Sequence, residues 1–127
     1  MMQGYVNQNY EATILVVIFS FNKTKSKPIN AIIDTGFSGF LSLPNKTINE
    51  LGLSWSYRDR GTLGDGSEVI FDIYNSQVIW NGQVQDIEVN SAETEPLIGM
   101  SLLRGFSLNI DTGVNGLVTI QKLDKSY

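Results

Sequence analysis

The chain contains no cysteine and no histidine among its 127 residues. The absence of cysteine excludes disulfides and thiol nucleophiles, and it leaves the redox compartment undecided. The absence of histidine excludes the Ser-His-Asp triad, the Cys-His pair and the usual zinc sites. A hydrolase with this composition would therefore have to use carboxylates, a lysine, or a metal ion held by oxygen ligands.

Charge is sparse and slightly acidic, and long hydrophobic runs are missing. There are 13 acidic and 9 basic residues, which gives a formal net charge of −4 without any block of like charge. This balance argues against nucleic acid as a partner, because its phosphates require a basic surface. The longest apolar run, Ile14–Phe19, is too short to span a bilayer, and the start of the chain lacks the pattern of a signal peptide. We therefore expect a soluble, cytoplasmic protein that makes no membrane contact.

What is present is a pattern rich in β-forming residues. The length and the hydrophobic content of 42% fit one domain over residues 1–127, with a core at about 10–121. Runs of β-branched and aromatic residues predict strands at Tyr10–Phe21, Pro28–Asp34, Phe40–Leu43, Trp55–Leu63, Glu68–Tyr74, Gln77–Trp80, Val84–Val89, Phe106–Ile110 and Leu117–Ile120.

Turn and helix signals connect these strands. Gly64-Asp65-Gly66 and Asn81-Gly82 predict tight hairpins, because these residues tolerate positive φ. Short helices are predicted at 45–51, ended by Gly52, and at 100–104. The strand at 28–34 is nearly all apolar, so we expect it to be buried on both faces. The predicted fold class is all-β.

An apolar strand that ends in a carboxylate is the most informative feature. Ala31-Ile32-Ile33 leads directly into Asp34-Thr35-Gly36, so a buried-looking strand carries an acid to its C-terminal tip. Burying a charge is costly unless a partner or hydrogen bonds compensate for it, and the position therefore suggests chemistry rather than solubility. The alternative is a structural role, in which Asp34 caps the turn by accepting hydrogen bonds from nearby backbone N–H groups.

The same tripeptide occurs a second time, at Asp111-Thr112-Gly113. The residues before it alternate in a half-exposed pattern and another strand follows, which predicts an ordinary hairpin turn. A single-chain enzyme that used both aspartates would need a second lobe. Too few residues follow Gly113 to form one, so we reject that interpretation.

Three landmarks follow one another in the chain. The turn at 34–36 is followed by Phe37–Pro44, then by the predicted hairpin at 63–67, and later by Pro96–Leu103, where two apolar residues and a glycine lead into a short helix. This ordered set resembles the retropepsin-like aspartic proteases, most closely the branch whose motif reads Asp-Thr-Gly-Phe. The resemblance covers nearly the whole chain. It implies a closed retropepsin-like barrel with one or two short helices, as a single lobe that forms a homodimer.

The resemblance implies an aspartic endopeptidase that acts on a peptide or protein substrate. One Asp34 from each subunit of a homodimer would meet at the two-fold axis. Two carboxyl groups at such a short distance cannot both ionise easily, so the pair would share a proton. One carboxylate would activate a water molecule and the other would act as an acid on the scissile carbonyl. Such a site needs no metal and no cofactor, which suits a chain without histidine.

The resemblance also assigns supporting roles. Thr35 would hydrogen-bond across the two-fold axis, and Gly36 would turn its N–H toward the carboxylate. Gly99 would let the strand of Leu97 and Ile98 cross closely beneath the turn. A flap that closes over the peptide and excludes water would be formed by Leu63, Gly64, Asp65, Gly66 and Ser67.

Two residues depart from the expected pattern. Many pepsin-like relatives have serine where this chain has Phe37, so one donor to the ionised carboxylate is missing, and we expect a less acidic working range. A pH–rate optimum as low as that of pepsin would count against this. Asp65 at the predicted flap tip would disfavour acidic substrates if it points inward. The rival function is a non-catalytic peptide-binding or dimerisation module on the same fold, in which the aspartate is vestigial.

Overall fold

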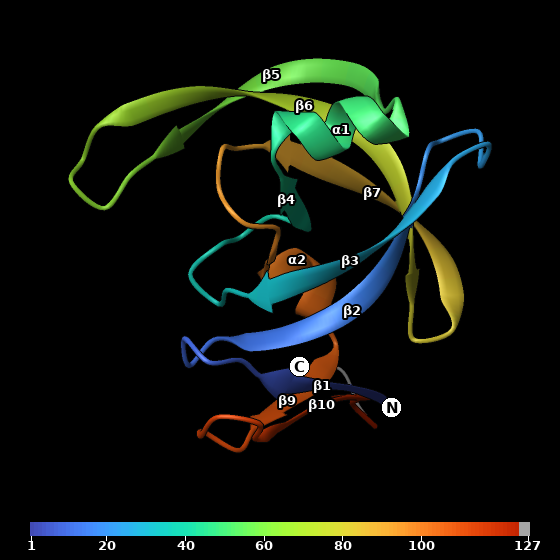
Figure 1. Ribbon diagram of the computed structural model, residues 1–127. Helices are drawn as coiled ribbons and strands as arrows, with labels where there is room; N and C mark the ends of the chain where they lie inside the picture. The colour runs from blue at the N-terminus through green and yellow to red at the C-terminus, as the bar shows by residue number, and fades with distance from the viewer. Residues whose placement is uncertain (125–127) are drawn as a thin grey trace.

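The structure is a computed structural model that describes residues 1–124. Within these residues the chain is mostly β, with two short helices, as the sequence predicted (Figure 1). The strands are β1 (Met2–Val6), β2 (Ala12–Phe19), β3 (Ser26–Ile33), β4 (Leu41–Leu43), β5 (Ser54–Thr62), β6 (Glu68–Trp80), β7 (Gln83–Ser91), β8 (Leu97–Ile98), β9 (Phe106–Ile110) and β10 (Leu117–Lys122). The helices are α1 (Asn45–Leu51) and α2 (Met100–Leu103), and neither is long and apolar enough to cross a membrane.

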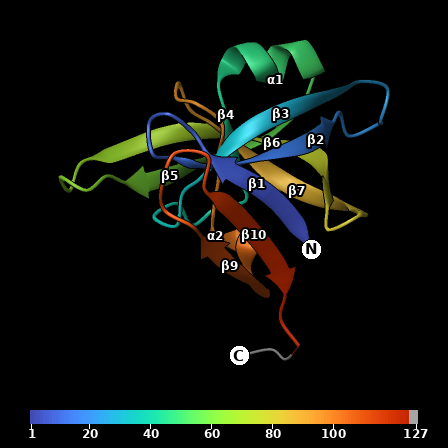
Figure 2. The same cartoon turned by 60° about the horizontal axis from the view of Figure 1, so that its bottom comes forward.

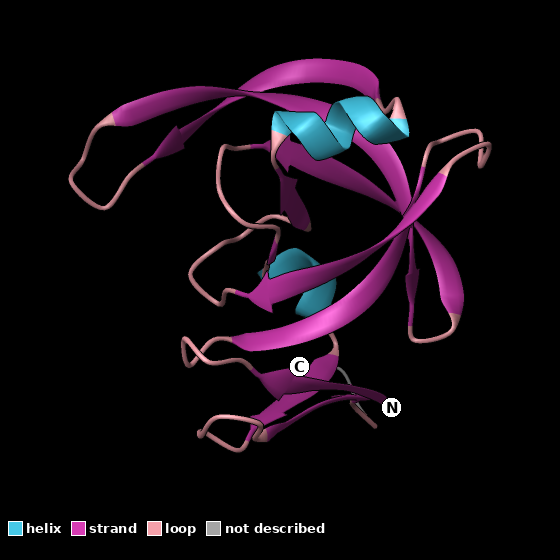
Figure 3. Cartoon of the chain, in the orientation of Figure 1, coloured by secondary structure: helices cyan, strands magenta, loops and turns pink. Residues whose placement is uncertain are grey.

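The strands join into one sheet with the order β5-β6-β7-β4-β8-β3-β2-β1-β10-β9. β6 pairs additionally with β2, through Ile18 opposite Val78 and Phe19 opposite Gln77, so the pairing also returns from β6 to β2. Most neighbouring strands are antiparallel, but β3 and β8 are parallel, and so are β4 and β7. Figure 3 shows α1 at the edge of this strand framework and α2 nearer its middle. The β5–β6 hairpin projects from the body in two different views (Figures 1 and 2).

Alternation of side chains along the strands builds the core. In β2, Ile14 and Val16 are buried, whereas Leu15 between them is 64% exposed. The expectation that the strand at 28–34 is buried on both faces is wrong, because β3 alternates and leaves Asn30 exposed. Successive side chains of a strand point to opposite faces, and only one face of β3 meets the core.

Two parts of the sheet differ from the sequence-based expectations. The separate strands predicted at 68–74 and 77–80 are one continuous strand, β6. The polar residues between them do not end the strand, because Ser76 is buried and its hydroxyl donates to the Phe19 carbonyl at 2.7 Å. β1 was not predicted at all, and it lies between β2 and β10. A near-terminal segment therefore joins the β9–β10 hairpin to the rest of the sheet.

Candidate active site

Asp34 follows directly after β3 and is held in place by β8. Its N–H donates to the Ile98 carbonyl at 2.9 Å, and the parallel register places Ile33 beside Ile98. β8 also pairs with β4, where Leu41 lies opposite Ile98. The short strand β8 thus lies between β3 and β4 and anchors the backbone at the point where the acid emerges. The sequence predicted this acid at a strand tip, and the structure places it there.

The two carboxylate oxygens of Asp34 have different surroundings. Oδ1 accepts a hydrogen bond from the Gly36 N–H at 2.9 Å, and the Asp34 carbonyl accepts one from the Phe37 N–H at 3.1 Å. Oδ2 accepts no hydrogen bond from residues 1–124. The side chain of Thr35, which is exposed, makes none within the same residues. The turn therefore orients one oxygen of a half-exposed carboxylate and leaves the other available.

The loop after Asp34 crosses β8 and α2 at very short range, at Gly99. A Cβ on Gly99 would lie 2.3 Å from the Gly39 carbonyl oxygen and 2.6 Å from the Phe37 carbonyl oxygen. The same crossing is tied by hydrogen bonds from the Gly99 N–H to the Phe40 carbonyl at 3.1 Å and from the Met100 N–H to the Phe37 carbonyl at 2.8 Å. The geometry therefore needs a residue without a side chain at position 99.

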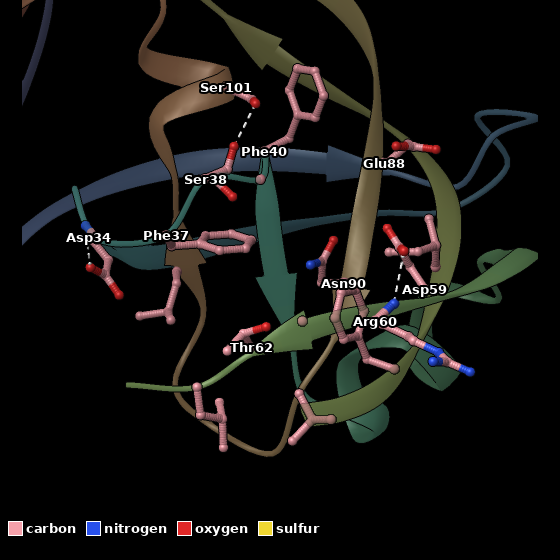
Figure 4. A pocket seen from close by; sticks show the side chains of 18 of the residues that line it. Asp34, Phe37, Ser38, Phe40, Asp59, Arg60, Thr62, Glu88, Asn90 and Ser101 are labelled. Carbon is pink, nitrogen blue, oxygen red and sulfur yellow. Dashed lines mark hydrogen bonds between the residues drawn. The ribbon is translucent and has the colours of Figure 1, made fainter. Parts of the chain in front are cut away.

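A groove of about 540 Å³ begins at Asp34 (Figure 4). Its walls come from the 36–40 loop, from the inner face of the β5–β6 hairpin and from β7. In Figure 4, Asp34 lies at one end of the groove, whereas Glu88, Asp59 and Arg60 lie near the other end. The lining includes residues from six segments, namely the 34–40 loop, β5, β6, β7, β8 and α2, and Asp34 lies at one end of the cavity rather than in its middle.

A second cavity, of about 470 Å³, also borders Asp34. Its lining comes from β1, the turn into β2, the end of β3 and the β9–β10 loop, and it includes Tyr10, Ile33 and Thr112. The second copy of the tripeptide is therefore near the first, which the sequence did not predict. Asp111 itself is exposed in a hairpin loop, where its N–H donates to the Leu117 carbonyl at 2.9 Å. Its position fits the ordinary turn that the sequence predicted.

The β5–β6 hairpin carries the predicted flap residues at its tip. The Leu63 N–H donates to the Ser67 carbonyl at 2.8 Å, and Gly66 has a φ of 86°. Leu63 lines the groove, whereas residues 64–67 do not. Asp65 Oδ1 accepts hydrogen bonds from the Ser67 N–H at 2.9 Å and from its hydroxyl at 2.6 Å. The Asp65 carboxylate thus caps its own turn.

This capping predicts a pH-dependent hairpin tip. The Ser67 hydroxyl, and then the Ser67 N–H, lower the pKa of Asp65 below its ordinary value near 3.8. Because the pKa is lowered in the folded state, the stabilisation is present above pH 3.8 and is lost as the pH falls through the lowered pKa. We expect Ser67→Ala to raise the pKa of Asp65, measured by NMR titration of its carboxyl carbon. An unchanged titration would show that the bond from the Ser67 hydroxyl does not form in solution.

The groove contains polar and charged residues that the sequence analysis did not single out. Tyr57 and Asp59 lie on the inner face of β5, and Glu88 lies on β7. The Glu88 carboxylate, with burial as a smaller cause, raises the pKa of the Tyr57 hydroxyl. The alternation of β5 could have placed Tyr57 and Asp59 on one face, but only the β6–β7 pairing brings Glu88 beside them. Within residues 1–124, no group of three or more His, Cys, Asp or Glu side chains could hold a metal ion.

Solved structures with a similar fold are aspartic proteases. One is the crystal structure of a retropepsin-like aspartic protease from Rickettsia conorii, with 22% identity, a TM-score of 0.60, and coverage of 94% of this chain and 87% of that chain. Another is EIAV protease complexed with the inhibitor HBY-793, with 23% identity, a TM-score of 0.53, and coverage of 76% and 88% respectively. No protein-family model matches the sequence, and no curated protein matches it significantly. The chain therefore has a retropepsin-like fold, as its ordered landmarks predicted.

Proposed function

We propose that this protein is an aspartic endopeptidase that is active as a homodimer, with one Asp34 from each subunit at the catalytic centre. The observation that carries this proposal is the placement of Asp34. The carboxylate stands at the meeting point of two cavities, with Oδ1 oriented by the Gly36 N–H and Oδ2 without a partner in residues 1–124. A residue that served only to cap the turn would not need to border a groove of about 540 Å³.

The proposed reaction is general acid–base hydrolysis without a covalent intermediate. The two Asp34 carboxylates share one proton, because two like charges at hydrogen-bond distance cannot both ionise easily. The ionised carboxylate takes a proton from water as the water oxygen attacks the scissile carbonyl carbon, and the protonated carboxylate donates its proton to the carbonyl oxygen, which gives a tetrahedral diol. The C–N bond then breaks as the first carboxylate passes its new proton to the leaving amine. One diol hydroxyl returns a proton to the other carboxylate, so that the carboxylic acid product forms and the dyad is restored. The peptide lies in the groove, and the β5–β6 hairpin with Leu63 closes over it. Thr35, whose side chain is exposed, hydrogen-bonds the partner's turn.

We infer that the other subunit binds on the side of the molecule where the 470 Å³ cavity lies. Its lining is largely apolar, and it includes Tyr10, which is 76% exposed and has a φ of 61°. A large aromatic side chain is rarely held in this backbone conformation and exposed to water at the same time. An intersubunit contact would bury the Tyr10 ring, which is a typical anchor of protein interfaces.

Tyr10→Asp should weaken the dimer. Aspartate tolerates positive φ, so the turn survives while the aromatic contact is lost and a charge is introduced. We expect the dimer dissociation constant to rise about tenfold or more, equivalent to about 1.4 kcal/mol, measured by analytical ultracentrifugation. Leu15→Asp is the matched control, because Leu15 is 64% exposed and lines a cavity that Asp34 does not border. Equal dissociation constants for both variants would argue against this interface.

Digestion of a peptide library tests the proposed function directly. At mildly acidic pH, the protein should cut at defined positions, and the rate per chain should rise with protein concentration until the dimer is fully formed. A protein that is dimeric by ultracentrifugation, binds peptides and leaves them intact would instead be a binding module. That result would contradict the catalytic proposal.

A further inference from the structure

We propose that Phe37 is a specificity-determining residue: its ring separates two compartments of the groove and limits the size of the substrate side chain that binds beside Asp34. The inference rests on the proposed peptidase function and adds a role for the Phe37 side chain itself. At the level of sequence, this residue completed the Asp-Thr-Gly-Phe motif and suggested the loss of a serine hydroxyl.

The Phe37 ring packs closely against the backbone of two glycines. A Cβ on Gly39 would lie 2.5 Å from the ring Cζ, and a Cβ on Gly99 would lie 2.6 Å from the ring Cδ2. The ring therefore rests on the backbone at two positions where only glycine leaves room for it. The Phe37 backbone is tied on both sides, to Asp34 through its N–H and to Met100 through its carbonyl. The ring cannot move closer to the backbone of Gly39 and Gly99 without displacing the turn that carries Asp34.

Two cavities meet at this ring. One is the 540 Å³ groove, and the other is a further cavity of about 390 Å³, distinct from the 470 Å³ cavity described above. The two cavities have six lining residues in common, namely Phe37, Leu63, Val69, Phe71, Asn90 and Leu97. Among these six, Phe37 alone belongs to the loop that carries Asp34. Figure 4 shows its ring extending from that loop toward Asn90, across the space between the loop and β7. Of the six residues that line both cavities, Phe37 is therefore the nearest to Asp34 in the sequence.

The two compartments differ in chemistry. Beyond the shared wall, the first is lined by Tyr57, Asp59 and Glu88, and we call it the polar compartment. The surface of the 390 Å³ cavity is mostly apolar, although beyond the shared wall its lining combines Ile70 and Ala92 with Ser42, Ser91 and Thr94; we call it the apolar compartment. A substrate side chain beside Asp34 must fit on one side of the ring. Shortening the ring should join the compartments and admit apolar side chains that neither compartment accepts alone.

The test compares side-chain size preference between Phe37 variants. In one arm, wild type, Phe37→Ala and Phe37→Leu digest peptides that differ only by leucine or tryptophan at each position next to the cleavage site. We expect the ratio of kcat/KM for tryptophan over leucine to rise about tenfold or more in Phe37→Ala at one position, and less in Phe37→Leu. Phe21→Leu is the matched control, because Phe21 is 53% exposed and lines neither cavity. Its ratio should stay at the wild-type value.

A second arm needs no catalysis. N-acetyl-tryptophan amide and N-acetyl-leucine amide are titrated into the same variants, and binding is followed by NMR through the Asn90 and Leu97 amides. Phe37→Ala should favour the tryptophan derivative about tenfold more than wild type does. If wild type cleaves no peptide but the ratio of the two dissociation constants changes in Phe37→Ala, the peptidase proposal fails and the role of Phe37 stands. An unchanged ratio in a folded variant, or no binding of either probe, would overturn the role of Phe37. If Phe37→Ala does not fold, the comparison of Phe37→Leu with Phe21→Leu decides the question.

Discussion

Replacement of Asp34 by asparagine should reduce peptide cleavage about 10³-fold while leaving the fold and the dimer intact. Asparagine keeps the size of the side chain and an oxygen that can accept the Gly36 N–H, so the hydrogen bond of 2.9 Å at Oδ1 can be retained. It cannot exchange a proton with water, which removes the acid and the base together. General acid–base catalysis of this kind contributes about 10²–10⁴-fold, so we expect kcat/KM to fall by about 10³-fold.

Asp111→Asn is the control for this variant, because the chain supplies the same tripeptide in another setting. Asp111 is exposed in the β9–β10 loop, and its carboxylate accepts only a long bond of 3.4 Å from Asn109 within the described residues. We expect wild-type activity from this variant in the same digestion assay. Cleavage that survives Asp34→Asn and disappears in Asp111→Asn would reverse the assignment of the catalytic residue.

Mixing experiments separate a shared site from one site per chain. If each dimer has a single centre with two Asp34 carboxylates, an Asp34→Asn chain in large excess should capture wild-type chains in inactive mixed dimers. Wild-type activity should then fall with added variant, at a rate set by subunit exchange. Undiminished wild-type activity, with exchange verified by mass spectrometry of differently labelled chains, would show that the chains act independently.

Most of the fold could be predicted from the sequence because its signals are local. Asn81-Gly82 forms the predicted hairpin turn with φ values of 53° and 77°, and Gly52 ends α1 with a φ of 60°. The turn of a hairpin and the end of a helix depend on the φ preferences of one or two residues, which the sequence states directly. The acid at the tip of β3 was predictable for the same reason, because the apolar run and the turn are contiguous.

The groove could not be predicted because its lining comes from strands that meet only in three dimensions. Glu88 reaches Tyr57 through the pairing of β7 with β6 and of β6 with β5. Such pairings depend on register, and a shift by one residue would place the other set of side chains in the groove. The position of Thr112 is equally non-local, since it lines the same 470 Å³ cavity as Asp34 although the two residues are far apart in the sequence. Local patterns identified the acid but not its surroundings.

Gly99→Ala should strongly destabilise the protein. Gly99 has φ −107° and ψ −179°, a conformation that alanine adopts readily, so the cost comes from contact alone. The added Cβ would lie 2.3 Å from the Gly39 carbonyl oxygen and 2.6 Å from that of Phe37, and both neighbours are backbone atoms that cannot rotate away. Overpacking typically costs 1–3 kcal/mol, and we expect about 3 kcal/mol or more here because the backbone itself must shift. Urea unfolding followed by circular dichroism measures this loss.

Gly64→Ala makes the same chemical change at a position where the added Cβ would contact no other atom. No heavy atom lies within 4 Å of the Cβ that would be added at Gly64, and its φ is not positive. Alanine there should leave the free energy of unfolding unchanged or raise it by about 0.4–1 kcal/mol, because it restricts the unfolded chain. The shift forced at Gly99 would also move the loop of Phe37 and Asp34, so any folded Gly99→Ala protein should lose activity beyond its loss of stability. Equal stability of the two variants would mean that the loop does not cross β8 as closely as 2.3 Å implies.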